Sequence, residues 1–555
     1  MASGTSTIQR KAVASRTRFF VGRRGRILRE NLTAYLFLFP STFLIFVFGL
    51  FPVAFSLYVS VYKWKIKQGD FKGLANYVNA MDNLAYVIAF GLAVGAIWLA
   101  VFFLLKSWRQ ARQTGEAPWL LIAPGFLFGL GGMALLRFAV LALPEILRIG
   151  EKVQRLEKTN ELFVQLFREA LLVEAVVQAR QQAFWLFLGG GLVWLALNRF
   201  GHTQKNTLYV GRFFAATFFS LAGYQIATFT YASIQEAYAT ALAAGEEIAI
   251  WPQFISISAG LILLYVSWSL WRRASKQSST AKIIGGLLAA LALLGGGWLL
   301  IIEIPFVLEA GDEALWIGLR VTAWYSFLTV PLQLFLGMGL AYLLFQNIRG
   351  KSFYRIIYFL PYITPTVAAA AVFRVIFSNR PTGMMNELWA AFGAEPLNWL
   401  LEPKAVFGLG SMTGPSLALV VIIIFNIWTY TGYNAVIFLA GLGRIPGTLY
   451  EAAEIDGANR WQSFWRITFP LLSPTTYFLS VLGVIGTFKA FNHVFVLRQS
   501  AALDTVDTLS MVIWDELFTR NRYDYAATLA FVLFGVILVL TLINNKVQGE
   551  RVFYG

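Results

Sequence analysis

The chain has 555 residues, of which 58% are hydrophobic and only 13% charged, whereas an ordinary soluble domain has about 25% charged residues. Its net charge is +16, and it has two histidines and no cysteine. The composition argues against a soluble nucleic-acid-binding protein, a disulfide framework, a thiol nucleophile and a histidine or thiolate metal site. We expect an all-α integral membrane protein whose basic residues gather in the loops that stay in the cytoplasm.

The N-terminal region begins with a polar, basic segment, 1–32, which we expect to be a cytoplasmic tail. The apolar run 33–62 follows. It is too long for the hydrophobic part of a signal peptide and has no small-x-small cleavage site, so it predicts a retained signal anchor. This first core helix and an external loop make up residues 33–83.

Residues 84–308 predict an inserted membrane bundle of six spans, arranged as three hairpins. Links inside the hairpins are basic and links between them are neutral or acidic, as the positive-inside rule requires. Between the first two hairpins, 144–182 is charged with apolar residues at helical spacing. It predicts external amphipathic helix, either a short hairpin broken near Asn160 or a helix on the membrane surface. The six expected spans are about 84–105, 118–142, 183–199, 207–230, 251–271 and 281–303.

The rest of the chain, 309–555, predicts the remaining five core helices, for a six-helix core and a total of about twelve transmembrane helices. An external loop, 379–415, is rich in glycine and proline. Charge in the links puts both termini in the cytoplasm. The five spans are about 315–345, 355–378, 416–441, 471–497 and 523–544.

One well-charged loop, 448–470, separates two of these spans. Thr448 and Glu451 have capping-box spacing, which predicts a helix that begins at Thr448. Gly457 is expected to end it, because glycine adopts the left-handed cap without strain. A second helix follows, and i, i+3, i+4 spacing puts its aromatic residues on one face: Trp461, Phe464 and Trp465.

This loop resembles the EAA loop of permease subunits in binding-protein-dependent (type I) ABC importers of the carbohydrate-uptake, maltose-type family. The pattern is EAA, three residues, G, nine residues, I-x-L-P, and only Phe469 departs from it. The stretch 71–77 also resembles the F-x-G-L-x-N-Y segment of sugar-importing permeases. The resemblance implies that the loop couples the chain to an ATPase through Glu451, Ala452, Ala453, Asp456, Gly457, Ala458, Ile467 and Pro470.

The resemblance further implies a non-catalytic subunit of the prokaryotic cytoplasmic (inner) membrane that imports a sugar or sugar derivative. Its partners would be a second permease subunit, two copies of a cytoplasmic ABC ATPase and an external solute-binding protein. ATP and Mg would be held by the ATPase, and this chain would need no cofactor. A complete phosphate loop is indeed missing from the sequence: Gly350-Lys351-Ser352 comes nearest, but Phe345 stands where its first glycine is needed.

In the implied family, the helices before and after the EAA loop carry the sugar contacts. Aromatic, amide and hydroxyl side chains on these spans suit a sugar, although a single Asn or Thr can also serve helix–helix contact. Lys489 predicts a polar cavity wall, because a charge inside a span is costly. His493 is expected to be a hydrogen-bonded structural residue. The candidate path residues are Thr429, Tyr433, Asn434, Gly483, Thr487, Lys489, Phe491 and Asn492.

Two other classes of membrane protein are alternatives to a permease subunit. A stand-alone secondary transporter with twelve spans would need two pseudo-symmetric halves and membrane carboxylates for ion coupling. The spans hold few acidic residues, and such a transporter would have no use for an EAA loop. A membrane enzyme would need paired carboxylates, a Ser–His pair or a metal cluster, and none stands out. The sequence does not identify the solute.

Overall fold

The computed structural model describes residues 23–65, 67–153, 159–200, 206–245, 250–276, 279–346, 348–409 and 412–549. Of the expected basic tail, 1–32, residues 1–22 therefore lie outside the described residues. The described chain is almost entirely helical, and its strands form two short antiparallel hairpins. The all-α prediction is confirmed. The chain divides into two compact units: unit 1 is 1–76 with 312–555, and unit 2 is 77–311.

Unit 1 begins with one nearly continuous helix and a small hairpin, and the division between the units falls inside α4 (Ala75–Met81). The later elements of this unit carry the long helices and the charged loop. The elements up to α4 are α2 (Arg23–Ile45), η2 (Phe46–Leu50), α3 (Phe51–Ser60), β1 (Tyr62–Trp64) and β2 (Gln68–Phe71). The later ones are α13 (Glu313–Phe345), α14 (Lys351–Ile363), α15 (Thr366–Ile376), α16 (Met384–Ala391), β3 (Gly408–Leu409), β4 (Met412–Thr413), α17 (Leu417–Leu442), α18 (Gly447–Ile455), α19 (Arg460–Ser463), η4 (Phe464–Thr468), α20 (Phe469–Leu471), α21 (Ser473–Phe488), α22 (Asn492–Leu497), η5 (Ser500–Ala502), α23 (Leu509–Trp514), η6 (Asp515–Thr519) and α24 (Tyr523–Gly549).

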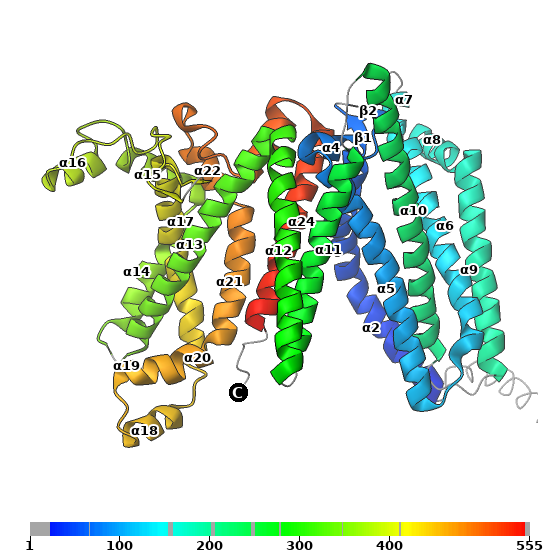
Figure 1. The fold of residues 1–555 in the computed structure, drawn as a ribbon, viewed down its shortest axis with the longest axis horizontal. Coiled ribbons are helices and arrows are strands. Elements are labelled where there is room, and N and C mark those ends of the chain that lie inside the picture. The colour runs from blue at the N-terminus through cyan, green and yellow to red at the C-terminus, as the bar shows by residue number, and fades with distance from the viewer. Residues whose placement is uncertain are drawn as a thin grey trace, which may run out of the picture. The chain divides into compact units, whose positions relative to one another are not determined.

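The core of unit 1 is built around α13 and α17, which pack along each other and also against α21 and α14 (Figure 1). Glycine allows the closest approach. A Cβ on Gly432 of α17 would lie 1.6 Å from the carbonyl oxygen of Tyr358 on α14, and one on Gly337 of α13 would lie 2.8 Å from the Cβ of Asn434. These helices therefore touch backbone to backbone, as small residues permit in membrane bundles.

The expected external loop 379–415 is organised by Asn386, a fully buried residue of α16. Its side-chain oxygen accepts from the Trp399 indole at 2.8 Å and from the Leu397 backbone N–H at 2.9 Å. Its amide nitrogen donates to three backbone carbonyls, those of Ser378, Arg380 and Leu397. One side chain thus ties together three parts of an irregular segment.

Unit 2 is a helical bundle in which α5 packs on α10, α6 on α9 and α10, and α11 on α12 and α5. Gly129 of α6 lies against Thr217 of α10, where an added Cβ would be 2.5 Å from the threonine Cβ. Gly260 and Gly296 make a similarly close contact between α11 and α12. The elements are α5 (Leu84–Thr114), η3 (Pro118–Leu121), α6 (Ile122–Leu147), α7 (Ile149–Lys152), α8 (Asn160–Leu172), α9 (Glu174–Phe200), α10 (Asn206–Ala244), α11 (Ile250–Ala274) and α12 (Ser279–Ala310).

The segment expected to be amphipathic, 144–182, contains the end of α6, two short helices, α7 and α8, and the start of α9. The side chain of Thr159 accepts from the Leu162 N–H and so caps the start of α8. Ile149, Leu166 and Ala170 pack together as the buried side of this pair. Residues 154–158, which join the two helices, lie outside the described residues.

Eight helices in the described residues are long and apolar enough to cross a membrane, or ten if each of two bent pairs is one span. The expected spans 183–199 and 207–230 fall in α9 and α10, which are not among them. Glutamine, threonine and glycine dilute the apolar residues of these two helices. The total of twelve spans stays a prediction.

Two expected spans are not straight. The helices of 355–378, α14 and α15, meet at 94°, because Thr364 precedes a proline and takes an extended conformation. The span expected at 471–497 is also divided. It consists of α21 and α22 with a break at 489–491, and α21 itself meets the preceding helical segment at 62°. The sequence analysis placed these two spans and did not predict the breaks inside them.

Candidate functional site

The charged loop forms two short helical segments, α18 and α19, that extend beyond the ends of α14, α17 and α21 (Figure 1). The expected capping box at its start is wrong. α18 begins at Gly447 with Pro446 as its N-cap, and no side chain caps it. Because proline already fixes a suitable backbone angle, the helix starts one residue early and Thr448 lies inside it.

Gly457 ends α18 as predicted. Its φ is +76°, in the left-handed region. The Ala458 N–H donates to the Ala453 carbonyl at 2.9 Å, and the Gly457 N–H donates to the Glu454 carbonyl at 3.0 Å. This pair of bonds is a Schellman motif, in which a residue without a Cβ is strongly preferred at the left-handed position.

The second helix, α19, has a cap that the sequence analysis missed. The Asn459 side chain accepts from the Gln462 N–H at 2.8 Å, and the Gln462 side chain accepts from the Asn459 N–H at 2.9 Å. Asn and Gln three residues apart are the signal of this reciprocal capping box. The helix then widens into a π-helix, η4, and continues as α20.

The two halves of the loop are tied to each other and to the core. The Tyr450 hydroxyl of α18 is 3.0 Å from the hydroxyl of Thr468, which is buried. The ring of Phe464 contacts Tyr342 of α13 at 5.0 Å between centroids. Packed side chains thus join the two halves of the loop to each other and to α13.

The surface of this loop is both charged, with acidic and basic side chains, and apolar. Ile455 is 87% exposed and Trp461 is 69% exposed, a high exposure for large apolar residues at a loop tip. Of the predicted coupling residues, the exposed ones are Glu451, Ala452, Asp456 and Gly457, and the partly buried ones are Ala453, Ala458, Ile467 and Pro470.

A polar cavity of about 290 Å³ lies within unit 1. Of the candidate path residues, seven line it: Tyr433, Asn434, Gly483, Thr487, Lys489, Phe491 and Asn492. Thr429 does not line it; this residue is buried, and its hydroxyl donates to the carbonyl of Phe425 in its own helix. The lining also includes two other polar residues of the same span, Asn426 and Tyr430, and two residues that were not predicted, Gln333 and Tyr362.

Three tyrosines form an aromatic wall of this cavity. Tyr362 of α14 stacks on Tyr433 of α17 at 4.5 Å between centroids and 25° between planes. It also meets Tyr430 edge to face at 5.7 Å. Aromatic faces next to hydroxyl and amide groups suit a ligand with both apolar and polar surface, such as a sugar ring.

Buried polar groups of α21 and α22 are paired with α13. His493 Nε2 is 2.6 Å from the Tyr325 hydroxyl, as expected for a structural histidine. The Thr487 hydroxyl is 2.7 Å from that of Ser326 and donates to the Gly483 carbonyl at 2.9 Å. These bonds hold the broken helix against α13. Lys489, at the C-terminal end of α21, is the one charged residue among those that line the cavity.

A charged cluster just beyond α22 is structural. Arg498 makes two parallel bonds to Asp515, at 2.9 and 3.0 Å, and a third contact to Asp507 at 3.3 Å. The hydrogen bond to Asp515 raises the pKa of Arg498, and burial raises the pKa of Asp507. A bidentate arginine of this kind fixes geometry. In the described residues, no group of three His, Asp or Glu side chains could hold a metal ion.

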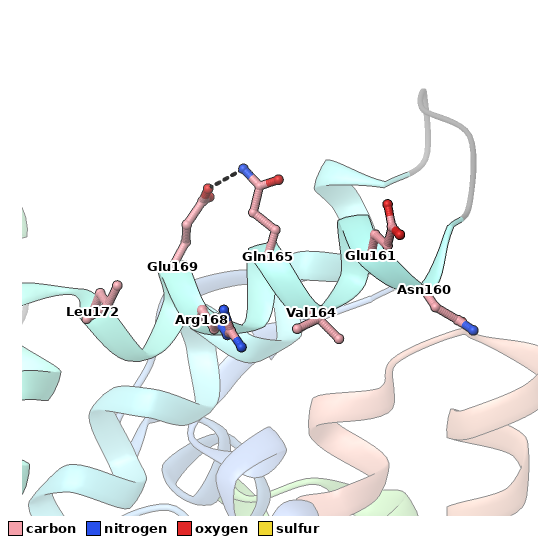
Figure 2. Close-up of a pocket in the computed structure, with 7 residues that line it drawn as sticks. All are labelled: Asn160, Glu161, Val164, Gln165, Arg168, Glu169 and Leu172. Atoms are coloured by element: carbon pink, nitrogen blue, oxygen red, sulfur yellow. Dashed lines mark hydrogen bonds between the residues drawn. The ribbon is translucent and has the colours of Figure 1, made fainter.

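A second hollow, of about 550 Å³, lies over α8 in unit 2. Figure 2 shows that its lining comes from this one helix, with Gln165 and Glu169 joined by a hydrogen bond of 3.1 Å. A surface formed by one helix cannot enclose a solute. The cavity in unit 1, which several helices surround, is therefore the better candidate site.

Apolar helices around a polar cavity, together with an exposed two-helix loop, are the makeup of a membrane permease. Residues 333–545, all in unit 1, match the family described as "Binding-protein-dependent transport system inner membrane component". The chain belongs to this family, and its resemblance to carbohydrate-uptake ABC permeases is confirmed.

Curated relatives support this assignment. The arabinooligosaccharides transport system permease protein AraP of Bacillus subtilis (strain 168) is 31% identical over 238 residues, which is 43% of this chain and 71% of the relative. The lactose transport system permease protein LacF of Rhizobium radiobacter is 31% identical over 43% of this chain and 78% of its own. A solved structure of a bacterial alginate ABC transporter, in complex with an alginate pentasaccharide-bound periplasmic protein, aligns with a TM-score of 0.40. The identity is 25%, over 45% of this chain and 83% of that chain.

Proposed function

We propose that this chain is the transmembrane subunit of an ABC importer for a sugar or sugar derivative. The cavity of unit 1 holds the solute during passage, and the loop 448–470 docks on a separate ATPase. One observation carries the proposal: α17 runs directly into this loop and α21 runs out of it, and both helices line the cavity. A movement imposed on the loop is thus applied to two walls of the solute site.

The proposed assembly has a second permease subunit, two copies of a cytoplasmic ATPase and an external solute-binding protein. The ATPase pair holds ATP and Mg. The chain lies in the cytoplasmic membrane with both termini and the loop 448–470 on the cytoplasmic side, so the loop can reach the ATPase. Sugars are the favoured solute because the cavity combines three tyrosines with amides and hydroxyls, and because AraP and LacF are named for oligosaccharides and lactose.

The test is reconstitution of this chain in liposomes together with its ATPase, second permease subunit and solute-binding protein. Glu451→Lys reverses a charge on the exposed face of α18, where a basic partner would be repelled. Glu454→Lys is the matched control, because it makes the same change on the same helix outside the EAA pattern. Uptake of lactose and of an arabinose trisaccharide is measured together with ATP hydrolysis.

We expect Glu451→Lys to lower ATPase copurification and uptake by at least about tenfold, which corresponds to about 1.4 kcal/mol, and Glu454→Lys to lower both much less. Equal losses in the two variants would argue for a general charge effect. Normal uptake and ATPase binding in Glu451→Lys would refute the proposed coupling.

A further inference from the structure

Two amide side chains in the cavity wall have unpaired polar atoms. Gln333 of α13 and Asn434 of α17 are each only 4% exposed. Gln333 Oε1 and Asn434 Nδ2 are shielded from water and have no hydrogen-bond partner among the described residues. A buried polar group without a partner is costly and is rare in native structures. Both residues contribute to the lining of the 290 Å³ cavity, so a small turn of either side chain would bring its unpaired atom to a ligand there.

Neighbouring glycines let both amides sit deep between the helices. A Cβ on Gly483 of α21 would lie 3.1 Å from Gln333 Nε2, and a Cβ on Gly337 of α13 would lie 2.8 Å from the Cβ of Asn434. A larger residue at either glycine would push the amide out of its place. The backbone of unit 1 therefore makes room for two polar side chains, each with one polar atom that the protein does not pair.

Other buried polar groups of the cavity wall differ in this respect. His493 is bonded to Tyr325, and Thr487 to Ser326, so α13 pairs the polar groups of α21 and α22. Gln333 is on the same helix about two turns further along, yet its oxygen is left without a donor. The contrast singles out Gln333 and Asn434 as groups available to a ligand.

We propose that Gln333 and Asn434 form a hydroxyl-binding subsite for the imported solute. Gln333 Oε1 accepts a hydrogen bond and Asn434 Nδ2 donates one, and a hydroxyl both donates and accepts. A carboxylate would suit the asparagine donor, but it would leave the glutamine oxygen unpaired. The pair thus favours a neutral, hydroxyl-bearing part of a saccharide. This inference rests on the proposed import function and adds the residues that select the solute.

The test replaces each amide by an apolar residue of similar size, Gln333→Met and Asn434→Leu, in the assembled complex. Removing an unpaired buried group should raise the Tm of the solute-free complex by about 2–4 °C. The same changes should raise the half-saturating concentration for uptake about tenfold, because the solute hydroxyl loses its partner. The probes are lactose, maltose and an arabinose trisaccharide.

Thr329→Val is the matched control. Thr329 is fully buried on α13, one turn before Gln333, and its hydroxyl is also unpaired, but it does not line the cavity. This variant should raise the Tm and leave uptake unchanged. A lowered Tm, or loss of folded protein, for Gln333→Met or Asn434→Leu would overturn the subsite, because it would mean that the protein pairs these amides.

A raised Tm with unaltered uptake kinetics would also overturn the proposal, since the solute would then pass without touching either amide. A wild-type complex that imports none of the three probes would count against the proposed function. The Tm comparison still tests whether the two amides are unpaired in the solute-free protein, whatever the uptake result.

Discussion

Gly432→Ala should separate two helices that carry the aromatic wall of the cavity. The new methyl group would lie 1.6 Å from the Tyr358 carbonyl oxygen, whereas a comfortable carbon–oxygen contact is about 3.3 Å. A backbone carbonyl cannot rotate away as a side chain can, so α14 and α17 must move apart by roughly 1.7 Å. Overpacking of this kind costs about 1–3 kcal/mol of stability.

The same movement reaches the site, because Tyr362 on α14 stacks on Tyr433, the neighbour of Gly432 on α17. Their rings are 4.5 Å apart at the centroids, and a shift of roughly 1.7 Å would weaken the stacking by moving them toward the outer limit of about 7 Å for an aromatic pair. Such a pair contributes about 0.5–1.5 kcal/mol beyond its buried area. We expect a fall in Tm together with a severalfold rise in the half-saturating sugar concentration.

Gly339→Ala is the control, because a Cβ at this position on α13 meets no atom within 4 Å. It should leave uptake unchanged and hold or slightly raise the Tm, since alanine favours a helix over glycine. Thermal unfolding and lactose uptake are measured for both variants in liposomes. The reasoning is refuted if Gly432→Ala matches Gly339→Ala in Tm and in uptake.

Two further predictions concern other parts of the chain. Asn386→Leu leaves the Trp399 indole N–H and the Leu397 backbone N–H without an acceptor. The free energy of unfolding should therefore fall by about 2–4 kcal/mol. Asn398→Leu, at an exposed position nearby, is the control and should change the Tm little. Excision of 77–311 with a polar linker should leave a chain that still assembles with its ATPase and retains part of its uptake, and a shortened chain that assembles but is wholly inactive would show that unit 2 belongs to the solute path.

Local turn chemistry made parts of the loop predictable. The end of α18 could be foreseen because a glycine between two amphipathic stretches has few other uses. Its beginning could not, because Pro446 and Thr448 offer competing starts and only the backbone decides between them. The Asn459–Gln462 cap was readable by the same rule that failed at Thr448. The π-helix η4 leaves no mark in the order of residues.

Side-chain direction limited what could be predicted about the cavity. Thr429 and Tyr433 are one turn apart and share a face of α17, yet Thr429 is buried away from the cavity and bonds to its own backbone. Gln333 was overlooked because a single glutamine in a 33-residue apolar helix has no motif around it. Its importance appears only when three helices are packed and its oxygen is seen to lack a donor. Spacing indicates the face of one helix, whereas a site depends on the contacts among several.

In the proposed importer, contacts at the base of the loop 448–470 would carry a movement of its tip to the cavity. Gly441 near the end of α17 lies against α21, where an added Cβ would be 2.7 Å from the Thr475 hydroxyl. Beyond this point, the contact between Tyr450 and Thr468 joins the two halves of the loop. α17 and α21 are thus in contact at the base of the loop, and the two halves of the loop are bonded to each other. In the proposed importer, a push on α18 would therefore move α17 and α21 together, and with them the groups that line the cavity.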